Sequence, residues 1–116
     1  MIQNETLNIS LLAALLDSLV EPVTFVDTEH IIRYMNKAAI AQYQKRGGAN
    51  LLGRSLLDCH NAKSNKIIME VVEAFQAGED ERFLNENAKR RLFMRAVRDA
   101  EGRLLGYYER FEPPAK

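Results

Sequence analysis

Cys59 and His60 are neighbours whose side chains could carry chemistry, and they lie in the segment of residues 52–66. Histidine nitrogen and cysteine thiolate are both axial ligands of haem iron in proteins. A thiol near the start of a helix can also become a reactive thiolate, the form that responds to oxidants. Haem binding through His60 and redox sensing by Cys59 are therefore two chemical interpretations of this segment.

Structural interpretations compete with both. His60 can simply cap or pack at the start of the next helix, and a free cysteine usually behaves as a small buried hydrophobe. The chain has one cysteine and two histidines, so an internal disulfide and Cys₄ or Cys₂His₂ zinc sites are excluded. The other histidine, His30, falls in a predicted turn, where we expect it to be exposed.

Catalytic motifs are missing from the sequence. It contains no nucleophile with a base at motif spacing, no Gly-rich phosphate loop and no paired-carboxylate signature. Asp27 and Asn36 are better explained as turn and helix-cap residues than as acid–base groups. We therefore expect this chain not to be an enzyme, and a small enzyme is kept only as the remaining alternative.

Composition sets the class of protein. A chain of 116 residues with 47% hydrophobic and 28% charged residues is typical of one globular domain. The formal net charge is zero, which argues against a nucleic-acid surface or an acidic membrane surface. No apolar run reaches the roughly 20 residues that span a bilayer. With its single cysteine and no basic segment at the N-terminus, the chain is expected to be cytoplasmic.

Periodicity predicts the elements around the first half of the chain. Residues 5–20 form an amphipathic helix with leucines at helical spacing, ended by Pro22. Residues 23–27 and 31–35 are β-branched or aromatic and close together, which predicts a β-hairpin. Asn36 then caps a helix over residues 37–44, which Gly47 and Gly48 close.

The second half carries one long helix and three strands. Ser64 is predicted to cap a helix that runs to residue 77 and ends at Gly78. Residues 81–85, 91–98 and 104–111 are predicted strands with short connections. Short links favour antiparallel pairing, and the helices form one block between strands. This order predicts an α+β fold with helices against one face of an antiparallel sheet.

Four motifs in this order resemble the PAS family. They are Pro-Val-Thr-Phe-Val-Asp at residues 22–27, Ile-Arg-Tyr-Met-Asn-Lys-Ala-Ala at 32–39, Leu-Gly-Arg-Ser at 52–55 and Val-Arg-Asp-Ala-Glu-Gly-Arg-Leu-Leu-Gly at 97–106. The resemblance covers residues 8–112. The segment at residues 59–64 is similar to a PAS subgroup with a Cys-His-Pro-Pro-Lys-Ser motif, although Asn61 and Ala62 replace the prolines.

The resemblance implies a five-stranded antiparallel sheet with helices over one face, ligands between the two layers, and a dimer contact through the N-terminal helix. Haem-binding PAS domains usually carry their histidine on the long helix, and residues 65–77 contain none. Light-sensing members need a cysteine soon after the Gly-Arg step, and Cys59 lies three residues too late for a covalent flavin adduct. Flavin or another apolar ligand held without a covalent bond stays open.

We therefore expect an N-terminal helix over residues 1–20 that caps the domain or forms a dimer contact, a PAS-like domain over 21–112 and a linker stump over 113–116. The expected function is a sensory and signal-transduction module that senses a small molecule or redox state. We expect it to form a homodimer through the N-terminal helix and the sheet and to act on a separate or fused output domain. The alternative is a ligand-free interaction module. The residues expected around a cavity or cofactor are Phe25, Tyr43, Cys59, His60, Phe75, Met94 and Tyr108.

Overall fold

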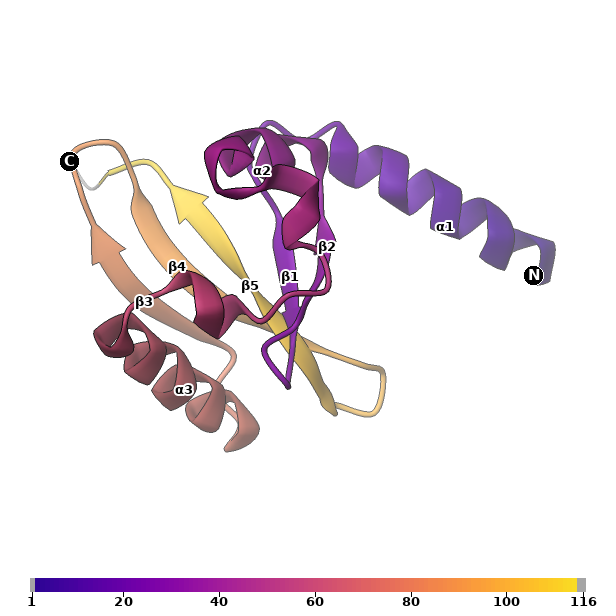
Figure 1. Ribbon diagram of the computed structural model, residues 1–116. Coiled ribbons are helices and arrows are strands. Elements are labelled where there is room, and N and C mark those ends of the chain that lie inside the picture. The colour runs from indigo at the N-terminus through magenta and orange to yellow at the C-terminus, as the bar shows by residue number, and fades with distance from the viewer. Residues whose placement is uncertain (1, 115–116) are drawn as a thin grey trace.

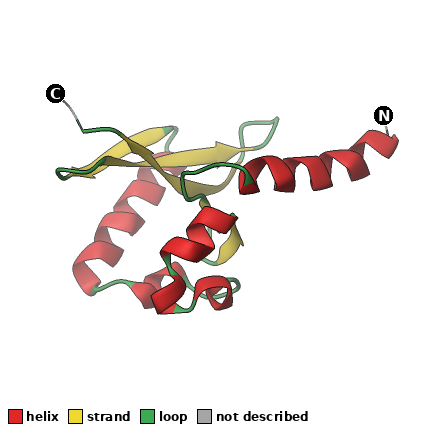
Figure 2. Cartoon of the chain, turned by 90° about the horizontal axis from the view of Figure 1, so that it is seen from above, coloured by secondary structure: helices red, strands yellow, loops and turns green. Residues whose placement is uncertain are grey.

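The computed structural model describes residues 2–114, with side chains described from residue 8 onward. Met1 and the last two residues of the expected linker, 115–116, lie outside the described residues. A five-stranded antiparallel sheet forms one layer, and helices cover one of its faces (Figure 2). The predicted α+β class, the five-stranded sheet and the leading helix are confirmed.

The sheet has the strand order β2-β1-β5-β4-β3. Its strands are β1 (Thr24–Asp27), β2 (Ile32–Met35), β3 (Glu81–Glu86), β4 (Arg91–Arg98) and β5 (Leu104–Glu112). The last strand therefore lies in the middle of the sheet, between the two hairpins. Phe25 is opposite Tyr108 and Val26 is opposite Tyr107, so neighbouring residues of β1 and β5 point to opposite faces.

The covering layer consists of short helical segments and one long helix (Figure 1). The segments are α2 (Lys37–Gln42) and three 3₁₀ turns, η1 (Gln44–Arg46), η2 (Gly48–Leu51) and η3 (Leu56–Cys59). The long helix, α3 (Ala62–Gln76), buries Ile68, Val71, Val72 and Phe75 toward the sheet. Each such side chain contributes about 1.5–3 kcal/mol of burial free energy, so this face fixes the helix on the sheet.

The ends of α3 are held by specific contacts. Asn61, not Ser64 as the sequence analysis expected, is the N-cap, because its side chain accepts a hydrogen bond from the Ser64 backbone N–H at 2.8 Å. At the other end, Arg98 of β4 donates to the carbonyl oxygens of Phe75 (2.7 Å) and Glu79 (2.9 Å). Arg98 thus satisfies backbone acceptors that the end of a helix leaves open.

The leading helix, α1 (Ile2–Asp17), projects away from the sheet (Figure 1). It ends before Pro22, so the proline does not stop it directly. Ser18 closes its last turn by donating its hydroxyl to the Leu15 carbonyl oxygen at 2.6 Å.

Asn36 joins α1 to the rest of the domain. Its side chain is fully buried, and its Oδ1 atom accepts hydrogen bonds from the backbone N–H groups of Val23 and Ala39, both at 2.9 Å. Its Nδ2 atom donates to the carbonyl oxygens of Leu16 (2.8 Å) and Glu21 (3.0 Å). One amide therefore caps α2 and holds the end of α1 at the same time.

Candidate functional site

A cavity of about 240 Å³ lies between the sheet and its helical cover. Its wall is mainly apolar and comes from both layers, with Val26, Ile32 and Met94 on the sheet side and Leu51 and Ile68 on the helical side. Small-molecule pockets are apolar concave sites of about 300–1,000 Å³ for drug-sized ligands. This cavity is slightly smaller, about the volume of eight water molecules at ~30 Å³ each.

Four of the residues expected around a cavity line this one: Tyr43, Cys59, His60 and Met94. Phe25 and Tyr108 do not line it, because the strand register points them to the outer face while Val26 and Tyr107 point inward. Phe75 is buried in the core, but it lies in the last turn of α3, whereas the cavity is lined by Ser64, Ile67 and Ile68 from the first half of that helix.

Cys59 and His60 lie at the wall of the cavity with simple local contacts. The Cys59 thiol is half-buried and lies 4.0 Å from the Ser55 carbonyl oxygen. His60 is exposed, and its Nδ1–H donates to the Leu56 carbonyl oxygen at 2.9 Å. That bond leaves Nε2 as the imidazole nitrogen available to a ligand.

Haem does not fit this arrangement. The cavity is below the range for drug-sized ligands, and a porphyrin with its side chains is larger than most of those. Within the described residues, no group of three or more His, Cys, Asp or Glu side chains could hold a metal ion.

Glu109 is the functional candidate that the sequence analysis missed. It follows Tyr107 by two residues on β5, so both side chains point to the inner face and line the cavity. Burial raises the pKa of Glu109 above its ordinary value, and electrostatic interactions with His60, Arg90 and the Tyr43 hydroxyl offset part of that rise. The sequence of β5 carries no signal that identifies it, because the two neighbouring tyrosines, Tyr107 and Tyr108, leave the inward face of the strand open.

Two tyrosines surround this carboxyl group. Tyr43, the C-cap residue of α2, is largely buried, and burial together with the nearby Glu109 charge raises its pKa to about 12. The Tyr107 hydroxyl forms a hydrogen bond with His30 Nδ1 at 2.9 Å. His30 is therefore half-buried and bonded to the sheet, not exposed as expected from its turn.

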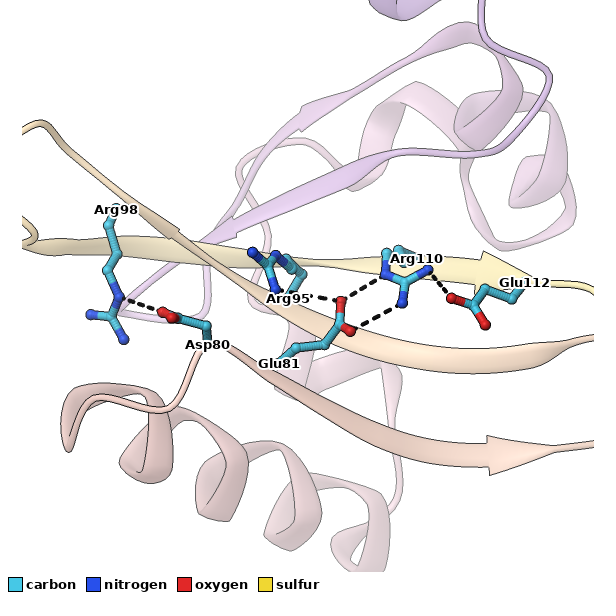
Figure 3. Close-up of polar contacts among 6 residues, drawn as sticks. All are labelled: Asp80, Glu81, Arg95, Arg98, Arg110 and Glu112. Atoms are coloured by element: carbon cyan, nitrogen blue, oxygen red, sulfur yellow. Dashed lines mark hydrogen bonds and ion pairs between the residues drawn. The ribbon is translucent and has the colours of Figure 1, made fainter.

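Acidic residues on the outer face of the sheet form ion pairs with arginines. Glu81 forms two hydrogen bonds with the Arg110 guanidinium, at 2.7 and 3.0 Å, and lies 3.8 Å from Arg95 (Figure 3). The Arg110 contact lowers the pKa of Glu81. Glu112 pairs with Arg110 at 2.7 Å (Figure 3). Near the end of α3, Asp80 pairs with Arg98 at 2.9 Å (Figure 3). Glu109, by contrast, forms no ion pair with any residue of the described range.

A membrane span is not found among the helices in residues 2–114: none is both long and apolar enough to cross a bilayer.

Comparisons with known proteins agree with the fold. A family model described as "PAS domain" matches residues 12–112. The structure is similar to the C-terminal domain of a Streptococcus mutans protein, with a TM-score of 0.70 and 23% identity over 90% of this chain and 84% of that one. It is also similar to a PAS domain from Colwellia psychrerythraea, with a TM-score of 0.67 and 11% identity over 90% and 95% of the two chains. A third similar structure is the Aer2 receptor of Vibrio cholerae, described as a dual PAS–haem oxygen sensor, with a TM-score of 0.56 and 17% identity over 79% and 92%. A search of curated proteins found no match.

Proposed function

Because this chain belongs to the PAS domain family, whose members are sensor and signal-transduction modules, we propose that it senses a small molecule bound in the cavity between the sheet and the helices. Binding would change the packing of the cavity wall and bias the domain between two arrangements that a partner reads. PAS domains are typically sensory and not catalytic, and this role requires no chemical step.

The observation that carries the proposal is the cavity itself, with a half-buried acid in its wall. A ligand-free interaction module would be expected to fill its core with side chains, because protein interiors are close-packed. Here about 240 Å³ is left between the layers, and Glu109 faces it without an ion-pair partner in the described part of the chain. A half-buried carboxyl group that loses part of its hydration without gaining an ion pair is better explained by a ligand that contacts it.

Haem and redox sensing are weaker candidates for the same site. The Aer2 receptor of Vibrio cholerae is a PAS–haem sensor, but the cavity of this chain is too small for the macrocycle. A Soret absorbance band in freshly purified protein, lost in His60→Ala, would reverse this ranking.

We also propose that the protein is located in the cytoplasm. Cys59 is a free thiol in the cavity wall, which fits a reducing compartment.

We further propose that α1 forms a dimer contact with a second copy of the chain and that the signal leaves through this helix. These four apolar side chains of α1 remain uncovered in a single chain: Ile9, Leu11, Leu12 and Leu15 are 72, 64, 55 and 56% exposed. Exposed apolar surface of this kind is typical of protein contacts. The output domain, fused or separate, would be the reader.

Release of a bound molecule tests the sensing role. Protein purified from cells is denatured, and the released small molecules are identified by mass spectrometry. We expect a specific compound from the wild type and less of it from Ile67→Trp, in which a large ring is placed at the cavity wall. Met69→Trp is the control, because Met69 is exposed on the same helix but does not line the cavity. No release from any of the three proteins would favour the ligand-free interaction module.

Light scattering after size exclusion tests the dimer. The wild type should elute as a dimer, and Leu12→Lys with Leu15→Lys should shift it toward the monomer. Met69→Lys, an exposed apolar residue of α3, should leave the dimer intact. A strict monomer at high wild-type concentration would exclude this contact.

A further inference from the structure

We propose that the ligand carries a protonated amine or amidine group on a small apolar body, and that this cation pairs with the Glu109 carboxylate inside the cavity. The inference rests on the proposed sensing function and specifies the chemical class of what is sensed.

The wall of the cavity selects a short apolar body. Aliphatic side chains dominate both layers, and the volume of about 240 Å³ excludes large cofactors. Among the residues that line it, Glu109 is the one acid, and the Tyr43 hydroxyl interacts with the same carboxyl group. A molecule that fills the apolar part therefore meets one carboxyl group with a hydrogen-bonding neighbour.

Comparison with the other acidic residues of the sheet shows that Glu109 lacks an arginine partner within the described residues. On the outer face, Glu81 is held by the Arg110 guanidinium through two hydrogen bonds (Figure 3). Glu109 lies one strand position before Arg110 and points the opposite way, so it has no comparable partner in the described residues. A carboxylate that is partly removed from water is stabilised by a bonded cation, and a ligand amine placed in the cavity supplies it.

The positive residues near Glu109 do not fill that role. Arg90 stacks on the Phe111 ring, with its guanidinium carbon 4.3 Å from the ring centroid, and Arg46 is an exposed residue at the wall whose charge solvent screens. His60 is exposed and donates its Nδ1–H to the Leu56 carbonyl oxygen. These groups offset part of the burial effect on Glu109, but none forms an ion pair with it.

Binding of such a cation depends on pH in a defined direction. Because the pKa of Glu109 is raised by burial, the acid loses its proton over a pH range above that of an ordinary carboxyl group. An alkylamine stays protonated up to about pH 10, like a lysine side chain. Its affinity should therefore increase as pH rises through the raised pKa of Glu109. The other titratable or charged groups around this carboxyl group or in the same cavity wall are Tyr43, Tyr107, Cys59, His60, Arg46 and Arg90.

Matched six-carbon probes test the proposal on the full chain. Hexylamine, 1-hexanol and hexanoate are titrated into isotope-labelled protein, and the dissociation constants are measured from backbone amide shifts between pH 5.5 and 8. We expect hexylamine to bind on the order of ten- to hundredfold more tightly than hexanol at pH 8, the range for a hydrogen bond to a charged group. Glu109→Gln should abolish this preference and its pH dependence. Glu101→Gln removes one charge from an exposed turn and should change neither.

The other outcomes are equally informative. Equal affinity for hexylamine and hexanol, or tighter binding of hexanoate, would overturn the cationic ligand and leave the sensing role intact. A pH dependence that disappears in His60→Gln and persists in Glu109→Gln would assign it to the imidazole and also overturn the proposal. If no probe binds and no molecule is released from the purified protein, the sensing function itself fails.

Discussion

Asn36→Asp separates the two structural roles of Asn36, which caps α2 and holds the end of α1. Asn36 Oδ1 accepts hydrogen bonds from the backbone N–H groups of Val23 and Ala39, and an aspartate oxygen can still accept both. Its Nδ2 atom donates to the carbonyl oxygens of Leu16 and Glu21, and an aspartate oxygen at that place would face two acceptors. The variant therefore keeps the cap of α2 and loses the two hydrogen bonds by which Asn36 holds the end of α1 and the segment after it.

The expected cost follows from the two lost bonds. Each is worth about 0.5–1.5 kcal/mol, and the carboxylate of a side chain that is fully buried in the wild type adds a further penalty, so we expect a loss of about 3 kcal/mol. For a domain of this size that corresponds to a decrease in melting temperature of roughly 12 °C.

Asn61→Asp is the matched control. Asn61 caps α3 with φ −78° and ψ 172°, nearly the same backbone as Asn36 with φ −79° and ψ 174°. Its side chain is exposed and only accepts a hydrogen bond, from the Ser64 N–H. Aspartate and asparagine are similar N-caps, so the stability should change by less than about 0.5 kcal/mol.

Urea unfolding of both variants at pH 7 measures the difference in free energy, and hydrogen exchange locates it. In Asn36→Asp the amide of Ala39 should stay protected, because its acceptor is retained. The amide of Ser18, bonded to the Ala14 carbonyl oxygen in the last turn of α1, should exchange faster. If both variants lose the same stability, or if neither does, the assignment of Asn36 as the joint is refuted.

Three further predictions concern the sheet. The pKa of Glu109 is raised in the folded state, so its stabilising contribution is complete below the ordinary carboxyl pKa and is lost as pH rises through the raised value. In urea unfolding, the free energy of unfolding of Glu109→Gln relative to the wild type should therefore increase from pH 5 to pH 8. The increase should be about 1.4 kcal/mol for each pH unit between the ordinary and the raised pKa. Gly106→Ala would place its Cβ against the Val26 carbonyl oxygen in the neighbouring strand and should cost about 3 kcal/mol, and a thermally neutral variant would contradict this close approach. Arg98→Lys cannot reproduce the guanidinium contacts with the end of α3 and should lower the free energy of unfolding by about 1–2 kcal/mol, whereas Arg95→Lys, at a single contact of 3.8 Å, should lower it by less than about 0.5 kcal/mol.

The fold was predictable because its signals are local. Residues 91–98 were predicted as a strand with the bounds that β4 has, since alternation and short turns specify such a segment by themselves. The start of α3 was predicted at the wrong residue, because residues 61–65 contain both Asn61 and Ser64, and each can cap a helix. Only the side chain that meets a free N–H in the folded chain decides between them.

The faces of the strands could not be assigned in the same way. Alternation identifies the inner face when the outer face is polar, but the outer face here contains Phe25, Phe93 and Tyr108. Two tyrosines stand side by side in β5, and the sequence gives no reason to prefer Tyr107 over Tyr108 as the inward one. A shift of one residue exchanges the two faces, so the expected cavity residues were partly those of the opposite surface.

The same one-residue ambiguity concealed Glu109. In the run Tyr107-Tyr108-Glu109-Arg110 the acid looks like half of a surface ion pair with its neighbour, whereas neighbours in a strand point to opposite faces. Once the register is known, Arg110 bonds to Glu81 on the outer face and Glu109 is left in the cavity beside Tyr43. Tyr43 is the C-cap of α2, and Asn36 is its N-cap. The six-residue helix α2 is therefore next to Glu109 at its C-terminal end and next to the Asn36 joint at its N-terminal end. A change in the bonding of Glu109 then acts on a helix that is itself tied to α1. For that reason the stability of the Asn36 joint bears on how a signal could leave the domain as well as on how the domain folds.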